Sequence, residues 1–261
     1  MRVRHANYMN KKERHNTILQ LLQQQGKVEV SYLSDYFQIS QLTIRKDLNE
    51  LNDRGQLQRC YGGAKSHLSV ELPINERLKK YLIQKKQIGK LAAELVRDGD
   101  SIFIDGGTTT AQVVDNLVHM NGLVVITNSI NIVNKLMNIG NINIYVPEGK
   151  IDQKGASIVG SLAEHALEKY NARIAFIGID GITKTQGLLN NSFEANSLSK
   201  ILLKNAQTKV VMADSSKFDA IGSVKLCNLS DIDVLITDRN IPQEYVDYCK
   251  EQNIQLIISE S

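Results

Sequence analysis

The sequence has few cysteines and no long apolar run, and each absence excludes a class of protein. Three cysteines are spread over 261 residues, at Cys60, Cys227 and Cys249. This odd, scattered set predicts neither a disulfide framework nor a metal site, as in proteins of a reducing compartment. No stretch approaches the ~20 apolar residues of a membrane span, and no apolar run follows the basic N-terminus. We therefore expect a cytoplasmic protein without signal peptide, membrane contact, metal or cofactor.

The net charge of +3 is mild, but it is unevenly distributed along the chain. Residues 1–65 hold 11 Lys and Arg against 6 Asp and Glu, whereas the rest of the chain holds 20 against 22. A basic N-terminal part is the electrostatic footprint of a nucleic-acid-binding domain. Chance clustering of a few lysines would give the same count, so only a sequence motif in this part can distinguish a DNA-binding domain from chance.

Residues 39–48 predict the start of an amphipathic helix. Ser40 can accept a hydrogen bond from an amide of the first turn, and Ile44, Leu48 and Leu51 define one apolar face. The other face carries short polar and cationic side chains, which suit base edges and phosphates. Taken alone, this segment is better explained as an ordinary surface helix. Its neighbours in the sequence favour a recognition helix.

Those neighbours complete a winged helix-turn-helix pattern. Residues 28–37 predict a short helix capped by Ser31, with Leu33, Tyr36 and Phe37 inward, and a tight connection follows it. Gly55 is expected to stop the second helix. Residues 56–64 then alternate and turn on two glycines, which predicts a β-wing that can reach a phosphate or a minor groove. The candidate DNA contacts are Ser31, Ser40, Gln41, Thr43, Arg45, Lys46, Arg59 and Tyr61.

This region resembles the N-terminal domain of DeoR-type transcriptional repressors. The resemblance implies that residues 1–65 bind double-stranded operator DNA and that the protein forms homo-oligomers. The matching positions include Glu13, Arg14, Gly26, Val28, Val30, Leu33, Phe37, Ser40, residues 43–48, Leu51, Gly55, Leu57, Arg59 and residues 61–64.

After a predicted linker at residues 66–81, with at most a short helix, the pattern changes. Residues 82–261 alternate short apolar strands with amphipathic helices, which predicts an α/β domain with a largely parallel sheet. Expected strands are 101–105, 124–127, 142–146, 174–177, 209–213, 234–237 and 255–258. Expected helices are 84–96, 109–118, 130–137, 162–170, 194–206 and 243–251.

Polar clusters follow most of these strands. Ligands of open α/β sheets bind outside the carboxyl ends of the strands. In residues 105–110, glycines allow close approach to the backbone, and amides and hydroxyls at a helix start can hold an anion such as phosphate. Asp105 would repel an anion, so we expect it to bind a sugar hydroxyl or to fix the loop. Singly, each cluster also fits a turn or a helix cap. The candidate effector residues are Asp105, Gly106, Gly107, Thr108, Thr109, Thr110, Asn128, Lys150, Asp180, Glu194 and Lys217.

Residues 104–110, 127–129, 155–160, 176–178, 180–181, 214–218 and 236–238 resemble the effector domain of the same repressors. That domain is similar to ribose-5-phosphate isomerase and senses phosphorylated sugars or sugar alcohols. By position, the resemblance makes Thr108, Thr109 and Thr110 the phosphate loop, Asp180 a sugar-contacting carboxylate and Lys217 a phosphate-facing cation. Glu148 departs from the family, where a second glycine is common.

Three functions remain to be separated. The isomerase pattern has a second acid three residues after Asp180, where this chain has Thr183, and a Lys-Gly-rich loop where it has residues 187–190. Glu194 is retained, but the helix dipole explains a glutamate at a helix start. We therefore predict a repressor of a sugar or polyol operon that a phosphorylated sugar releases. An activator with the same parts, and an isomerase-like enzyme, are the alternatives.

Overall fold

The computed structural model describes residues 9–54, 56–65 and 74–260. The chain divides into two compact units, Met1–Glu71 and Leu72–Ser261. They are called the N-terminal and the C-terminal unit below, and each is described by itself.

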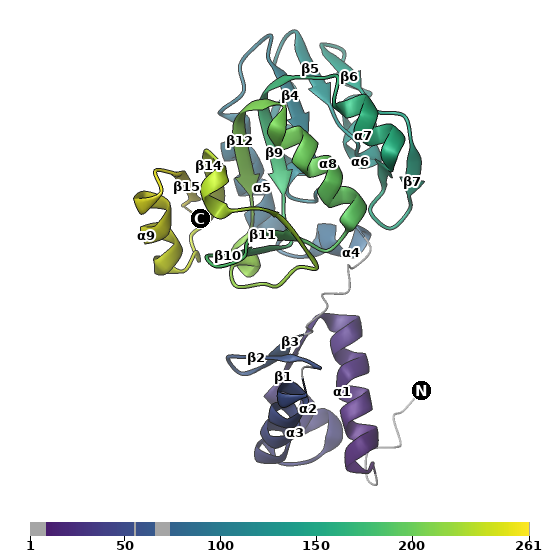
Figure 1. Cartoon of the computed structure of the whole chain (residues 1–261), viewed down its shortest axis with the longest axis vertical. Helices are drawn as coiled ribbons and strands as arrows, with labels where there is room; N and C mark the ends of the chain where they lie inside the picture. The colour runs from purple at the N-terminus through teal and green to yellow at the C-terminus, as the bar shows by residue number, and fades with distance from the viewer. Residues whose placement is uncertain (1–8, 55, 66–73, 261) are drawn as a thin grey trace. The chain divides into compact units, whose positions relative to one another are not determined.

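The N-terminal unit is a winged helix-turn-helix, as predicted (Figure 1). A three-stranded antiparallel sheet of order β1-β3-β2 accompanies its helices. One apolar core, with Ile18, Leu33, Ile44 and Leu48 at its centre, joins all the helices to the sheet. The elements are α1 (Lys11–Gln25), β1 (Lys27–Glu29), α2 (Val30–Phe37), α3 (Gln41–Asp53), β2 (Gln58–Cys60) and β3 (Gly63–Lys65).

The start of α2 differs from the prediction. Val28 pairs with Ala64 in the sheet, so the backbone up to Glu29 is held as a strand and α2 begins only at Val30. Ser31 therefore lies exposed in the first turn instead of capping it, and α2 has no side-chain cap. Tyr36, expected inward, is exposed beside Tyr32. The predicted helix stop at Gly55 lies outside the described residues.

The C-terminal unit is built on a seven-stranded sheet in which every neighbouring pair is parallel. Its order is β15-β14-β12-β9-β4-β5-β6. All seven predicted strands are present, so the expected α/β class is confirmed. They are β4 (Ser101–Ile104), β5 (Leu123–Ile126), β6 (Ile142–Tyr145), β9 (Ala172–Gly178), β12 (Ala206–Met212), β14 (Val234–Asp238) and β15 (Gln255–Ser259).

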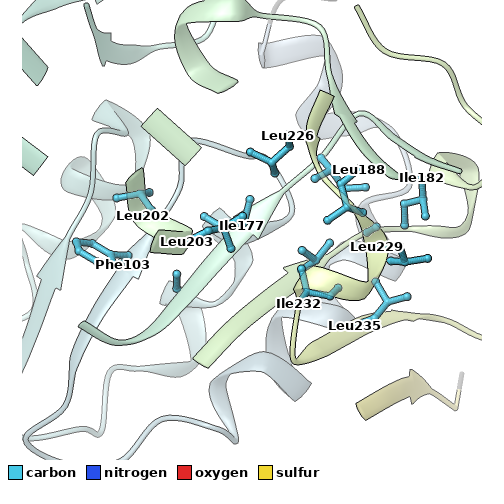
Figure 2. Packing of buried hydrophobic residues seen from close by; sticks show 14 of the residues in the cluster. Phe103, Ile177, Ile182, Leu188, Leu202, Leu203, Leu226, Leu229, Ile232 and Leu235 are labelled. Carbon is cyan, nitrogen blue, oxygen red and sulfur yellow. The ribbon is translucent and has the colours of Figure 1, made fainter. Parts of the chain in front are cut away.

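Helices cover both faces of this sheet, which gives three layers. In β9, Ala175 and Ile177 point into one apolar core, and Ile174 and Phe176 into the other. The first core lies under α7 (Ser161–Leu167), α8 (Phe193–Lys204) and α9 (Gln243–Glu251); Figure 2 shows Ile177 beside the α8 leucines. The second lies under α5 (Leu82–Ala93) and α6 (Ile130–Leu136).

The segment after β4 is not the predicted α-helix. It forms two 3₁₀ turns, η1 (Thr110–Gln112) and η2 (Val114–Asn116). Its residues are buried tightly under α5: a Cβ atom on Gly89 of α5 would lie 2.5 Å from the Cβ of Gln112. The hydroxyl of Thr110 also donates back to the carbonyl oxygens of Asp105 and Gly107. Close packing and this local bonding accompany the tighter 3₁₀ winding.

Several short strands escaped prediction. A hairpin joins β7 (Lys150–Asp152) to β8 (Ser157–Val159). A small antiparallel sheet contains β10 (Gly181–Thr183), β11 (Gly187–Asn190) and β13 (Val224–Cys227). The helix expected to reach Ala206 ends at Lys204, because Ala206 already pairs with Ala172 in the sheet.

Part of the predicted linker is folded onto the C-terminal unit. A short helix, α4, covers Ile74–Lys79, and its first residue is buried. The amide of Ile74 donates to the carbonyl of Lys154, which lies between β7 and β8. The side chain of Lys85 donates to the carbonyl of Arg77. Residues 66–73 of the predicted linker lie outside the described residues.

Candidate DNA-binding and effector-binding sites

The helix α3 separates an apolar face from a polar one. Ser40 caps it, since its hydroxyl accepts a hydrogen bond from the Thr43 amide at 3.1 Å. The hydroxyl of Thr43 lies 2.9 Å from that of Ser40, so both belong to the cap. Ile44, Leu48 and Leu51 are fully buried. The exposed residues of the outer face are Gln41, Leu42, Arg45, Lys46 and Asn49.

Arg45 and Lys46 differ from most other cations of the N-terminal unit. Within the part of the chain that the structure describes, neither has an ion pair or a hydrogen-bond partner for its charge. In contrast, Lys11 pairs with Glu50 at 2.5 Å, and the Arg59 guanidinium donates to the carbonyl of Gly63 inside the wing. Two unpartnered cations on an outward helix face can bind phosphates without first breaking a bond.

The wing presents its predicted contacts differently. Tyr61 is fully exposed at the turn between β2 and β3. Arg59 is partly buried; its amide donates to the side chain of Asn52 on α3, which fixes the wing to that helix. The geometry therefore brings Ser40, Gln41, Arg45 and Lys46 together on one helix, and Tyr61 onto a separate turn.

Asp47 is a residue of this site that sequence reasoning missed. It is buried on the inner face of α3 and accepts hydrogen bonds from Arg14 Nε at 2.6 Å and Nη2 at 3.1 Å. His15 Nε2 lies 3.0 Å from Asp47 Oδ1, the oxygen that also accepts from Arg14 Nη2. These contacts hold the recognition helix to α1. The sequence contained a signal for this role: Asp47 lies one helical turn from Ile44 and from Leu51, on the apolar face. A charge buried there requires a partner.

The C-terminal unit has a topological switch point between β4 and β9. From β4 the strand order runs outward through β5 to β6, and from β9 it runs the other way through β12 and β14 to β15. Crevices outside such points are where open α/β sheets bind ligands. The predicted clusters at residues 105–110 and at Asp180 flank this point.

The backbone after β4 approaches β9 closely and leaves donors available. A Cβ atom on Gly107 would lie 3.4 Å from the Cα of Gly178 and 2.9 Å from the hydroxyl oxygen of Thr110. Among the described residues, the amides of Gly107, Thr108 and Thr109 have no hydrogen-bond partner. The Thr110 hydroxyl, by contrast, is fully used within the loop. The hydrogen-bond donors available to an anion are therefore the amides of the loop. The α-helix predicted at residues 109–118, whose dipole would have added to them, is absent.

Asp105 holds this loop. Its Oδ1 accepts a hydrogen bond from the Gly106 amide at 2.7 Å, and its Oδ2 accepts one from the Ser199 hydroxyl of α8 at 3.3 Å. Burial raises the pKa of this carboxyl to about 6, against the lowering effect of those donors. The carboxyl thus takes the second of its two expected roles, fixing the loop.

Lys217 and Asp180, predicted from separate strand ends, are brought together. Lys217 Nζ lies 3.8 Å from Asp180 Oδ1, and both side chains are half-buried. Asp180 Oδ2 also accepts the Asn191 amide. The Asp214 side chain accepts hydrogen bonds from the amide and hydroxyl of Ser216 and makes no ion pair with Lys217. The two charges therefore face each other across neighbouring strand ends.

The remaining predicted residues lie on the β5 side. Asn128 is buried close to Gly106: a Cβ atom on Gly106 would lie 3.7 Å from Asn128 Oδ1. This oxygen has no hydrogen-bond partner among the described residues. Lys150 and Glu194 form an ion pair of 3.7 Å, but both are exposed. Exposed pairs contribute little stability, so either group can change partner at small cost.

Lys85 is the second residue that sequence reasoning missed. It is buried near the start of α5, and its Nζ donates to the Arg77 carbonyl at 2.7 Å. Burial lowers the pKa of its ammonium to about 8; the charge of Asp214 opposes this and that of Lys217 adds to it. Asp214 Oδ2 and the Thr237 hydroxyl, at neighbouring strand ends, are buried without a partner among the described residues. The sequence contained a signal for this burial, because the spacing of Lys85 from Ile88 and Ala92 places it on the apolar face of the helix.

The fold defines a class of protein: a winged helix-turn-helix followed by an α/β unit with polar residues at the carboxyl ends of its parallel strands. Two family models match the chain. The DeoR-like helix-turn-helix domain matches residues 14–70, and the DeoR C terminal sensor domain matches residues 81–239. The chain belongs to the DeoR family of transcriptional regulators.

Relatives match along nearly the whole chain. The HTH-type transcriptional repressor GlcR of Bacillus subtilis is 30% identical over 97% of this chain and 98% of its own length. The HTH-type transcriptional regulator IolR of the same organism is 30% identical over 88% and 92%. The glycerol-3-phosphate regulon repressor of Escherichia coli is 29% identical over 95% and 99%.

Solved structures are more distant. Ribose 5-phosphate isomerase A from Methanocaldococcus jannaschii is 24% identical, with a TM-score of 0.38 over 55% of each chain. The translation initiation factor eIF-2B of Pyrococcus horikoshii is 18% identical, with a TM-score of 0.45 over 90% of each. Similarities this low carry no argument about function. In the described part of the chain, no helix is long and apolar enough to cross a membrane.

Proposed function

We propose that the chain is a repressor of a sugar or polyol utilisation operon, and that a phosphorylated sugar or sugar alcohol releases it from its operator. Relatives named as repressors of glycerol-3-phosphate and aga genes support this function. The observation that carries it is a combination within the described residues: cations without a partner face outward on α3, and polar atoms without a partner lie at the carboxyl ends of β5, β12 and β14.

In this proposal the N-terminal unit binds DNA through α3 and the wing. Arg45 and Lys46 contact phosphates, and Gln41 reaches base edges in the major groove. Ser31, Ser40 and Thr43 lie near the two helix starts, and Arg59 and Tyr61 contact the backbone from the wing. A homo-oligomer would place two such units on paired half-sites.

The effector binds in the crevice of the C-terminal unit. The amides of Gly107, Thr108 and Thr109 hold the phosphate together with the ammonium groups of Lys217 and Lys85. The carboxylate of Asp180 and the amide of Asn128 take sugar hydroxyls, and Lys150 and Glu194 close the outer end. A dianion beside Lys217 and Lys85 supplies the negative charge that Asp180 and Asp214 only partly provide.

Binding of effector and of operator are coupled reciprocally, because each favours a different conformation of one chain. An activator would use the same contacts with the opposite effect on transcription. An isomerase would need a general base beside the reacting carbon. Asp180 faces Lys217 instead, and Thr183 stands at the position of the second acid.

A screen of sugar phosphates on the full-length chain tests the proposal. Each compound, its dephosphorylated form and inorganic phosphate are compared by the shift in melting temperature. Active compounds are then added to the protein bound to DNA from the promoter beside its gene. We expect one phosphorylated compound to raise the melting temperature and release the DNA, and its dephosphorylated form to do neither. Release without loss of transcriptional repression would contradict the function, and turnover of ribose 5-phosphate would favour the enzyme.

A further inference from the structure

Leu42 is an apolar residue on the exposed face of α3. It is the second residue of α3, and its side chain is 64% exposed, whereas Ile44, Leu48 and Leu51 of the same helix are fully buried. Among the described residues of the N-terminal unit, it is the one large aliphatic side chain in the exposed class. Leu42 is not part of the apolar core, so its side chain is available to a partner.

The neighbours of Leu42 restrict the kind of partner that can cover it. Residues three and four positions apart adjoin on a helix surface, so Leu42 lies beside Arg45 and Lys46, with Gln41 next to it in the chain. Both cations lack an acidic partner in the described part of the chain. An apolar side chain set among unpartnered cations suits a polyanion that carries apolar groups. It does not suit the apolar core of another protein, where the cations would lose their hydration.

Duplex DNA is such a partner, and only one group in its major groove matches leucine. Base edges there present hydrogen-bond donors, acceptors and the 5-methyl group of thymine. The isobutyl group of leucine neither donates nor accepts. The N-terminal residues of a recognition helix are the ones that meet base edges, and Leu42 is in the first turn.

We propose that Leu42 determines sequence specificity by packing against the 5-methyl group of a thymine in the operator. This inference rests on the proposed DNA binding by α3 and deepens it. Arg45 and Lys46 fix the helix on the phosphates, which carries no sequence information by itself. Leu42 then favours one base at one position of each half-site.

Replacing thymine by uracil tests this contact, since uracil lacks only the methyl group. The full-length protein first selects duplexes from a randomised pool. In a selected duplex, each thymine is then changed to uracil singly, and the dissociation constant is measured. We expect one position per half-site to weaken binding about fourfold, the effect of one buried methyl group. At that position Leu42→Ala should bind thymine and uracil duplexes equally well.

Controls separate this contact from general damage. Ile83→Ala is the matched variant, because Ile83 is 71% exposed on α5 of the other unit; it should keep the full uracil effect. The uracil series on the parent protein needs no variant to fold. Insensitivity of the parent to every uracil, or an unchanged uracil effect in Leu42→Ala, overturns the role of Leu42 while DNA binding stands. Failure to select any duplex overturns DNA binding itself.

Discussion

The two units present their candidate sites in opposite ways. In the N-terminal unit, Arg45 and Lys46 are unpartnered and exposed. In the C-terminal unit, Asn128, Asp214 and Thr237 each have a buried polar atom with no partner among the residues that the structure describes. An exposed cation without a partner costs little, because water solvates it, whereas a buried polar atom without a partner costs free energy. The exposed cations are therefore compatible with a stable free protein, whereas the buried polar atoms would gain free energy from a bound polar group.

Loss of Asp47 should have the largest effect, since it is the buried charge on which the surface site depends. Asp47→Ala leaves the Arg14 guanidinium without its carboxylate, which should lower the free energy of unfolding of the N-terminal unit by about 3 kcal/mol. Chemical denaturation of the full-length chain, followed by circular dichroism, measures it. Asp53→Ala, on the same helix, is the control. A loss below about 1 kcal/mol would mean that the network contributes little.

The second largest effect is expected from the exposed cations of α3. Replacing Arg45 and Lys46 by alanine should weaken DNA binding roughly a hundredfold, if each makes a charge-assisted contact. The slope of log affinity against log salt should fall by about two units. Stability should be unchanged, because neither residue has an ion-pair partner in the described part of the chain. Equal affinity of parent and variant in a gel-shift assay would remove α3 from the interface.

Lys217 tests the buried site. Lys217→Ala removes a charge-assisted contact worth roughly 1.5–3 kcal/mol, so effector affinity should fall about tenfold to a hundredfold. DNA binding without effector should persist, giving a repressor that ignores its inducer. The gap in affinity between the phosphorylated and dephosphorylated compound should narrow. If the variant releases DNA at the same effector concentration as the parent, Lys217 does not face the ligand.

Asp105 predicts a pH dependence of stability. Its folded pKa, about 6, lies above the ordinary value of 3.8. Between these values the folded state retains a proton that the unfolded state has lost, so this carboxyl reduces stability as pH rises from about 4 to 6. Relative to Asp105→Asn, the parent should lose about 2 kcal/mol over this interval. Parallel pH profiles of melting temperature would show that the carboxyl titrates normally.

Replacement of Lys85 should change the free energy of unfolding least, and its contribution should vary with pH in the direction opposite to that of Asp105. Burial disfavours its charge, so Lys85→Met should stabilise the free protein by about 1 kcal/mol while weakening effector binding. Its folded pKa, about 8, lies below the ordinary 10.5, so between these values the unfolded state binds more protons and the parent should gain stability with rising pH. A variant that is both less stable and unchanged in effector affinity would assign Lys85 a structural role only.

Sequence alone was sufficient for the parts of the fold with a strong pattern. The seven strands of the parallel sheet contain short apolar runs, which is the signal used to predict them. The inner strands β4, β9 and β14 are buried on both faces, whereas the edge strands β6 and β15 are partly exposed. The strands β7, β8, β10, β11 and β13 pair antiparallel outside the seven-stranded sheet, so the alternation of strand and helix that indicated the parallel sheet does not include them. The helix expected at 109–118 was wrong because packing under α5, which propensity does not contain, decides its winding.

The candidate sites divide in the same way. Asp180 and Lys217 were predicted separately because each follows a strand, and the parallel sheet brought them to one edge. Lys85 and Asp47 were missed because their importance comes from burial among distant groups. Ser31 was assigned the wrong place because the sheet takes up the residues before it, a long-range pairing with Ala64 and its neighbours.

The pairing of β4 with β9 also has a consequence for the order of folding. Ile102 pairs with Ile174, whereas every other neighbouring pair in the seven-stranded sheet joins segments much nearer along the chain. Closing the longest loop costs the most chain entropy, and contacts of large sequence separation slow folding. The switch point lies between these two strands. If the proposed effector binds there, a newly made chain must complete its slowest strand pairing before it can respond to that effector.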